Sequence, residues 1–101
     1  MVKLESKIVQ YPEQLTEPGR YVIKSVKPPQ DTRFGPTVIL ILTSGKGEER
    51  SAFVPYSSET TEVTNLGRLL KAFGNDTDRW RDKQVDVTFD ESGKRTIRPV
   101  A

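Results

Sequence analysis

Residues 63–89 read VTNLGRLLKAFGNDTDRWRDKQVDVTF, and the spacing of their apolar residues changes along the stretch. In the first part the apolar residues recur every three or four positions, which is the period of an amphipathic helix. These residues are Val63, Leu66, Leu69, Leu70 and Phe73. From Gln84 to Phe89, apolar and polar residues alternate instead, which is typical of a half-buried strand. The stretch therefore predicts one helix followed by one strand.

The predicted helix has signals at both ends. Ser58 or Thr60 is placed to cap its N-terminus, acidic residues lie in its first turn, and Gly74 is placed to end it. Residues 75–78, with the sequence NDTD, offer a second cap that leads through Trp80 into the next strand. The position of Trp80 between helix and strand favours a structural plug in the core over a role in binding.

Three strands are predicted before the helix, over residues 20–27, 37–43 and 50–56. All three are rich in β-branched or aromatic residues, and a turn at residues 44–47 joins the second to the third. The proline pair at 28–29 should end the first strand, because proline cannot donate to a ladder. This leaves a polar loop over residues 27–36 with Arg33 and Phe34 at its tip, and long loops in compact domains are often functional.

A fifth strand is predicted over residues 95–100, after a turn at residues 91–94, with Pro99 at a sheet edge. The chain is thus mostly β with one helix, in the order β-β-β-α-β-β. This is the connectivity of the OB-fold, a five-stranded Greek-key barrel whose strands two and three and loops bind oligonucleotides or oligosaccharides. We expect a single OB-like domain over residues 1–101, with an N-terminal arm or accessory strand over 1–19 and the barrel over 20–101.

The composition excludes several kinds of chemistry. The chain has 101 residues and neither cysteine nor histidine, which removes disulfides, thiolate nucleophiles, the usual general base and the commonest transition-metal ligand. No paired-carboxylate or Ser-Lys motif stands out. Asp76, Asp78 and Asp82 lack the glycine and the terminal glutamate of a calcium loop, so we interpret them as helix-capping residues. We expect a binding protein and not an enzyme, with no metal and no cofactor.

The charge of the chain limits the kind of partner. The formal net charge is only +2, and acidic and basic residues are interspersed. A dedicated duplex-DNA binder is strongly basic, so contact with nucleic acid must here depend on where the cations lie. The longest apolar run, residues 38–42, is far shorter than the ~20 residues that span a bilayer. We therefore expect a soluble, cytoplasmic protein with no signal peptide and no membrane partner.

One part of the chain resembles a known group of proteins. Residues 65–74 (NLGRLLKAFG), residues 76–78 (DTD), Trp80 and Lys83 are similar to small uncharacterised proteins of archaeal and phage type. Those proteins often have Trp-x-Gly-Lys where this chain has Trp-Arg-Asp-Lys at residues 80–83. They are suspected to be OB-like binders of single strands. The resemblance implies the same fold and binding for this chain, and an archaeal or phage source.

The predicted fold gathers aromatic and basic residues that suit single-stranded nucleic acid, with DNA slightly favoured over RNA and little sequence preference. Aromatic rings stack on bases of any identity, and cations neutralise phosphates. The candidate binding residues are Lys24, Lys27, Arg33, Phe34, Arg50, Tyr56, Lys94 and Arg95. Phe53 is a further candidate for a stacking ring, and the alternation of its strand leaves open whether it lies on this surface or in the core.

The second strand is unusual, because residues 38–42 are apolar on both faces while a barrel wall needs only one apolar face. Its outer face must be covered by the N-terminal arm, by a second copy of the chain or by another protein. The last two possibilities define an alternative function, a protein–protein adaptor or subunit that docks through Ile39 and Ile41. The expected partners are therefore single-stranded nucleic acid or, in the alternative, a homodimer or protein partner on this strand.

Overall fold

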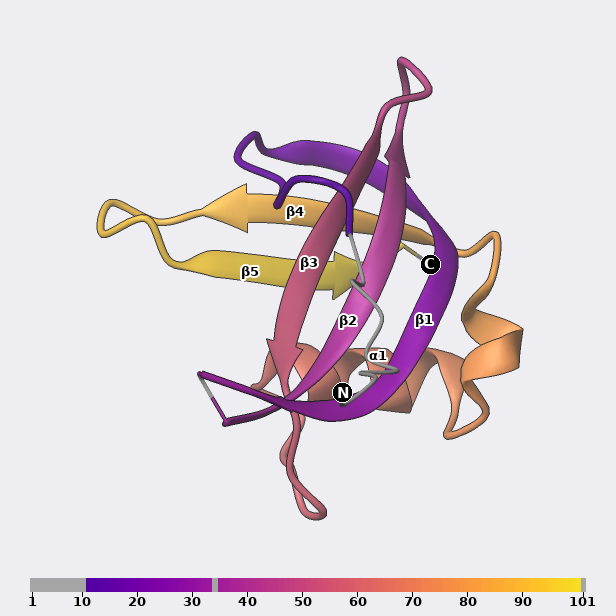
Figure 1. The fold of residues 1–101 in the computed structure, drawn as a ribbon, viewed down its shortest axis with the longest axis vertical. Coiled ribbons are helices and arrows are strands. Elements are labelled where there is room, and N and C mark those ends of the chain that lie inside the picture. Colours follow the sequence, from indigo (N-terminus) through magenta and orange to yellow (C-terminus); the bar gives the residue numbers. More distant parts are fainter. Residues whose placement is uncertain (1–10, 34, 101) are drawn as a thin grey trace, which may run out of the picture.

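The computed structural model describes residues 11–33 and 35–100, and Figure 1 shows its fold. The elements are, in chain order, β1 (Gly19–Thr32), β2 (Gly35–Ser44), β3 (Glu49–Pro55), α1 (Asn65–Phe73), the 3-10 helix η1 (Thr77–Trp80), β4 (Gln84–Phe89) and β5 (Arg95–Pro99). The predicted order of strands and helix is confirmed. Residues 1–10 of the predicted arm lie outside the described residues. No helix of the described part is long and apolar enough to cross a membrane.

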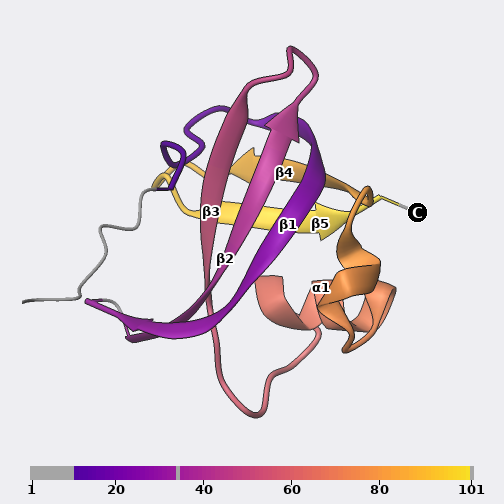
Figure 2. The same cartoon turned by 45° about the vertical axis from the view of Figure 1, so that its right-hand side comes forward.

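All five strands belong to one antiparallel sheet with the order β3-β2-β1-β4-β5, in which β4, β1, β2 and β3 have Greek-key order. Strand β1 curves through the sheet, so that residues 19–22 pair with β4 while residues 21–32 pair with β2. In Figures 1 and 2, β2 and β3 consequently cross over β4 and β5, and α1 lies near the lower end of β2 and β3. In the described chain β3 and β5 remain edges that do not pair with each other, so the sheet is not closed into a barrel.

The prediction that Pro28 and Pro29 end the first strand and open a long loop is wrong, because β1 continues to Thr32. The pairing of β1 with β2 is shifted between Lys27 and Gln30, and both prolines lie inside this irregularity. This half of β1 pairs with β2 alone, so a proline on its free side, which lacks an N–H, removes no ladder hydrogen bond. Only two positions therefore separate β1 from β2.

The helix begins later than predicted. Its N-cap is Thr64, and not Ser58 or Thr60, because the Thr64 hydroxyl accepts a hydrogen bond from the N–H of Gly67 at 2.9 Å. The segment before the helix folds tightly against the first turn. A Cβ atom at Gly67 would lie 1.7 Å from the carbonyl oxygen of Thr61, so this close approach requires glycine.

The segment after the helix is built around Trp80, which is 1% exposed. Its indole N–H donates to the carbonyl oxygen of Gly74, the residue that ends α1 as predicted, at 2.9 Å. The indole also makes an edge contact with Phe73, with ring centroids 6.3 Å apart. Asp76 caps η1 by accepting a hydrogen bond from the N–H of Asp78 at 3.0 Å. The buried position of Trp80 and the second cap are therefore confirmed.

The hydrophobic core lies between one face of the sheet and the two helical segments. Strand β2 contributes alternate residues to it, namely Val38, Leu40 and Leu42. Other members come from β1, β3, α1, η1, β4 and β5, and are Tyr21, Ile23, Ala52, Val54, Leu66, Leu69, Trp80, Val85, Val87 and Ile97. Leu15, from the segment before β1, completes this cluster and is 3% exposed.

The opposite, outer face of β2 is also buried, as its sequence requires. Ile39 and Ile41 are 1% and 5% exposed, although neither belongs to the core cluster. Part of the segment before β1 lies against the neighbouring strand β3. A parallel bridge joins Gln14 to Ser51, and the N–H of Leu15 donates to the carbonyl oxygen of Ser51 at 3.0 Å. Within the described part of the predicted arm, the contact with the sheet is thus an isolated bridge on β3.

Asp82 is the one residue other than glycine with a positive φ in the described chain, at 67°. Its N–H donates to the carbonyl oxygen of Ile23 at 2.8 Å. This left-handed conformation is better tolerated by aspartate or glycine than by alanine. We expect Asp82→Ala to lower the free energy of unfolding by about 1 kcal/mol and Asp82→Gly to change it by less than about 0.5 kcal/mol.

Urea denaturation of the two Asp82 variants measures this difference. An equal loss of stability in both variants would show that the aspartate side chain matters and that the backbone conformation at Asp82 does not.

Candidate functional site

Two side chains lie at the free edges of the sheet, where Asn65 binds β5 and Arg95 links β5 to β3. Asn65, the first residue of α1, donates to the carbonyl oxygen of Arg95 at 3.2 Å and accepts from the N–H of Ile97 at 3.0 Å. Its amide therefore occupies the edge of β5 as a neighbouring strand would. On the other side, the Arg95 guanidinium donates to the carbonyl oxygen of Phe53 on β3 at 2.9 Å. We call the gap between β3 and β5, which the Arg95 side chain bridges, the seam.

Arg95 places a positive charge inside the seam. Burial lowers the pKa of its guanidinium below the usual value, although arginine remains protonated at neutral pH. Its Nε atom is buried and makes no hydrogen bond within the described part of the chain. A guanidinium carries several N–H donors, so the bond to Phe53 leaves others available for an anion.

A cleft with a volume of about 570 Å³ opens beside the seam. It lies between the end of β3, the segment that leads into α1, and the β4–β5 hairpin. Its charged lining residues are Arg68, Asp90, Lys94 and Arg95, which give it a net charge of +2. Tyr56 and Val63 also line it. They are 40% and 76% exposed, and they are the large apolar side chains that the described chain leaves exposed. The cleft thus combines apolar surface with positive charge.

The start of α1 holds Arg68 in the cleft. The Arg68 guanidinium donates to the side-chain oxygen of Asn65 at 2.9 Å and to the carbonyl oxygen of Val63 at 2.7 Å. Asn65, which binds the edge of β5, therefore also orients a cation of the cleft. Because Thr64 is the cap, Val63 lies outside the helix, and this explains why a residue of the predicted apolar helix face is exposed.

The β4–β5 hairpin is fixed by the carboxylate of Asp90. One of its oxygens accepts hydrogen bonds from the Ser92 hydroxyl at 2.7 Å, the Ser92 N–H at 2.9 Å and the Lys94 N–H at 2.8 Å. These bonds, that of the Ser92 side chain first, lower the pKa of Asp90. Their contribution to stability is present above the ordinary aspartate pKa and is lost as the pH falls through the lowered pKa of the folded state.

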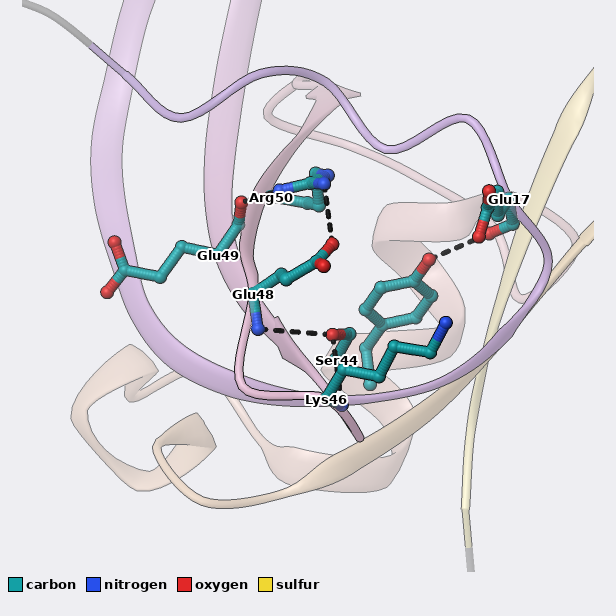
Figure 3. A network of polar contacts seen from close by, with 7 residues as sticks. Glu17, Ser44, Lys46, Glu48, Glu49 and Arg50 are labelled. Atoms are coloured by element: carbon teal, nitrogen blue, oxygen red, sulfur yellow. Dashed lines mark hydrogen bonds and ion pairs between the residues drawn. The ribbon is translucent and has the colours of Figure 1, made fainter.

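Arg50 lies at the opposite end of β2 and β3 from the cleft. Its guanidinium donates to the carboxylate of Glu48 and to the carbonyl oxygen of Glu49, each at 2.7 Å (Figure 3). It lines a hollow of about 460 Å³ whose charged residues are Arg20, Lys46 and Arg50 with Glu13, Glu17 and Glu48. Three cations and three carboxylates cancel, so this hollow is much less suited to an anion than the cleft.

The other predicted residues lie on β1 or beyond it. Lys24 forms an ion pair with Glu49. Lys27 is exposed on β1, and Arg33 is exposed in the short connection to β2. Phe34 lies outside the described residues. Of the eight predicted residues, the cleft brings together Tyr56, Lys94 and Arg95.

Sequence reasoning missed three residues of the cleft. Val63 fits the helical period, so its exposure follows only from the late start of α1. Arg68 lies among the helix residues and has no motif of its own. Asn65 gave one signal, because asparagine is typical of helix ends, but its bonds to β5 depend on tertiary structure.

We expect Asn65→Ala to lower the free energy of unfolding by about 1–2 kcal/mol, because the β5 carbonyl and N–H groups that it satisfies lose their partners. Hydrogen exchange should show the effect most strongly at the N–H of Ile97. The matched control is Asn75→Ala, at an exposed position after α1, which should change stability by less than about 0.5 kcal/mol. Unchanged protection of the Ile97 N–H would contradict the assignment of Asn65 as a bridge.

The cleft can accept a flat apolar group on Tyr56 and an anion on its cations. Among residues 11–33 and 35–100, no group of three or more acidic side chains is placed to hold a metal ion. No family model matches this chain, and no curated protein matches it.

Proposed function

We propose that this chain is a non-catalytic, OB-like module that binds single-stranded nucleic acid in the cleft beside the seam. The observation that carries the proposal is the exposed ring of Tyr56 within a lining of net charge +2. A ring and cations together match a ligand that alternates flat bases with phosphates.

The sheet supports the OB-like part of the proposal. An OB-fold is a partly open Greek-key barrel of five strands, and the sheet order β3-β2-β1-β4-β5 with a helix between β3 and β4 agrees with that arrangement. The hairpin that contributes Lys94 to the cleft corresponds to the loop between strands four and five, which binds oligonucleotides in that fold.

In this proposal the cleft recognises the general form of a single strand. A base stacks on Tyr56, while the phosphates on either side of it contact Lys94 and Arg68. Arg95 adds positive charge to the same lining. None of these contacts distinguishes one base from another, so we expect little sequence preference. We expect DNA to bind at least as well as RNA, because the lining offers no arrangement dedicated to the 2′-hydroxyl.

Substitution of Tyr56 tests the stacking contact. We expect Tyr56→Ala to lower the affinity for a labelled single-stranded oligonucleotide about tenfold, because one base loses its stacking partner. Tyr56→Phe keeps the ring and should bind within about twofold of the original chain. Fluorescence anisotropy titrations at low and moderate salt measure both variants. Equal affinities for the alanine and phenylalanine variants would contradict a stacking role.

The alternative function, docking of a protein partner through the outer face of β2, has less support. Ile39 and Ile41 are 1% and 5% exposed within the single chain, so a partner would first have to uncover them. An adaptor of that kind would bind with little dependence on salt, whereas a contact with phosphates weakens steeply as salt rises.

A further inference from the structure

A second hollow adjoins the cleft and shares Arg95 with it. It has a volume of about 320 Å³ and is lined by Gln14, Thr37, Phe53, Pro55 and Arg95. Pro55 and Arg95 also line the cleft, so the two sites meet at one guanidinium. Phe53 is half-buried and pairs with Ile39, which places its ring on the outer face of the sheet. One aromatic ring therefore lines each site, Tyr56 in the cleft and Phe53 in the hollow, and Arg95 lines both.

Another aromatic side chain, Tyr11, rests on Phe53. The two rings meet edge to face, with centroids 6.5 Å apart and an interplanar angle of 86°. The hydroxyl of Tyr11 accepts a hydrogen bond from the side-chain amide of Gln30 on β1 at 3.0 Å. Tyr11 thus spans β2, with a ring contact on β3 and a hydrogen bond on β1. A nucleobase offers the same pair of features, an aromatic ring with hydrogen-bonding groups at its edge.

Within the described chain, hydrogen bonds to Ser51 hold residues 12 and 13 to the sheet. The hydroxyl of Ser51 donates to the carbonyl oxygen of Pro12 at 2.8 Å, and the N–H of Ser51 donates to the carbonyl oxygen of Glu13 at 2.9 Å. The buried anchor of the segment is Leu15, which is 3% exposed. In Figures 1 and 2 the indigo segment runs along β3 before it enters β1. Residues 11–13 can leave the sheet while Leu15 stays in the core, provided that these two bonds to Ser51 break.

The geometry points to a second base-binding position on Phe53, which Tyr11 occupies in the free chain. This inference rests on the proposed function, because the ligand is a single strand that extends from the cleft past Arg95. Its next base displaces Tyr11, stacks on Phe53 and bonds to the amide of Gln30. Lys27 is exposed on the same face as Phe53, since both pair with Ile39, and it contacts a phosphate of the extended strand.

Titrations with two oligodeoxythymidylates of different length distinguish binding at this second position from binding in the cleft. One has about three nucleotides, which the cleft holds, and the other has about twelve, within the range of OB-fold site sizes. We expect Tyr11→Ala to bind the longer one about two- to tenfold more tightly, because the base no longer competes with the ring of Tyr11. Affinity for the shorter one should stay the same, and Tyr11→Phe should bind the longer one within about twofold of the original chain.

The gain from Tyr11→Ala should disappear when Phe53→Leu is also present, because the stacking surface is then gone. If the original chain binds the shorter oligonucleotide but Tyr11→Ala does not bind the longer one more tightly, the inference of a second position is wrong, while the proposed binding in the cleft is retained. If the original chain binds neither oligonucleotide at low salt, the proposed function is wrong and the second position falls with it. Thermal unfolding of each variant identifies any that fail to fold.

Discussion

Replacing Lys94 by glutamate and Arg68 by glutamine in one variant should lower the affinity for a single-stranded oligonucleotide about 30- to 100-fold at low salt. Together, Lys94→Glu and Arg68→Gln change the charge of the cleft by three units, from +2 to −1. Arg95 then remains as the one cation of the lining, against Asp90 and the glutamate at position 94. Two phosphate contacts are lost and one repulsion is added. Glutamine at position 68 keeps a donor for the carbonyl oxygen of Val63, so the start of α1 is preserved.

The chain offers a matched control at the other end of the sheet. Lys46→Glu with Arg50→Gln makes the same chemical changes and the same change in net charge, but in the hollow where charges already cancel. We expect this control to lower the affinity by less than about threefold, because exposed charges farther apart than the Debye length are screened. Equal losses in the two double variants would mean that only the net charge of the chain matters and that the cleft does not.

Trp80→Ala should lower the free energy of unfolding by about 3–5 kcal/mol, the range for removing a large aromatic side chain from a core. For a chain of this size that corresponds to a fall in melting temperature of roughly 15–30 °C. The loss combines the cavity left by the indole, the edge contact with Phe73 and the bond to the carbonyl oxygen of Gly74. Urea denaturation followed by circular dichroism measures it, since this variant lacks the only tryptophan.

Trp80→Phe separates packing from hydrogen bonding at this position. It keeps an aromatic ring but leaves the carbonyl oxygen of Gly74 without its donor, so we expect a loss of about 1–2 kcal/mol. A loss below about 1 kcal/mol in Trp80→Ala would contradict the structural role of Trp80.

The sequence predicted the elements that depend on local pattern. The alternation of residues 84–89 and the apolar run of β2 gave strands close to those observed, and Gly74 ended the helix as expected. The prediction that the outer face of β2 is covered was also correct, because Ile39 and Ile41 are buried. In each case the signal lies in neighbouring residues, whose period or conformational preference is the same wherever the segment packs.

The errors arose where tertiary contacts override local preference. Pro28 and Pro29 lie within β1 because a shift in the β1–β2 pairing accommodates them, and no local rule reveals such a shift. Ser58 and Thr60 are good caps by type, but the close approach of Thr61 to Gly67 makes Thr64 the cap.

The candidate site was predicted in part for the same reason. The sequence identified the aromatic and basic residue types, and three of the eight predicted residues meet in the cleft. It could not show that Arg50 is neutralised by Glu48 at the far end of the sheet, or that Arg68 and Lys94 line the same cleft. These pairings depend on how β3, α1 and the β4–β5 hairpin come together, which the period of each element does not encode.

Mapping of amide chemical shifts during titration with a single-stranded oligonucleotide tests most directly whether the cleft is the binding site. At low salt we expect the largest shifts within residues 56–68 and 90–96, the two segments that contribute most of the cleft lining, with shifts that saturate and diminish as salt is added. The β2–β3 turn at the opposite end should change little. Shifts centred on that turn, or no saturable shifts at low salt, would contradict binding in the cleft.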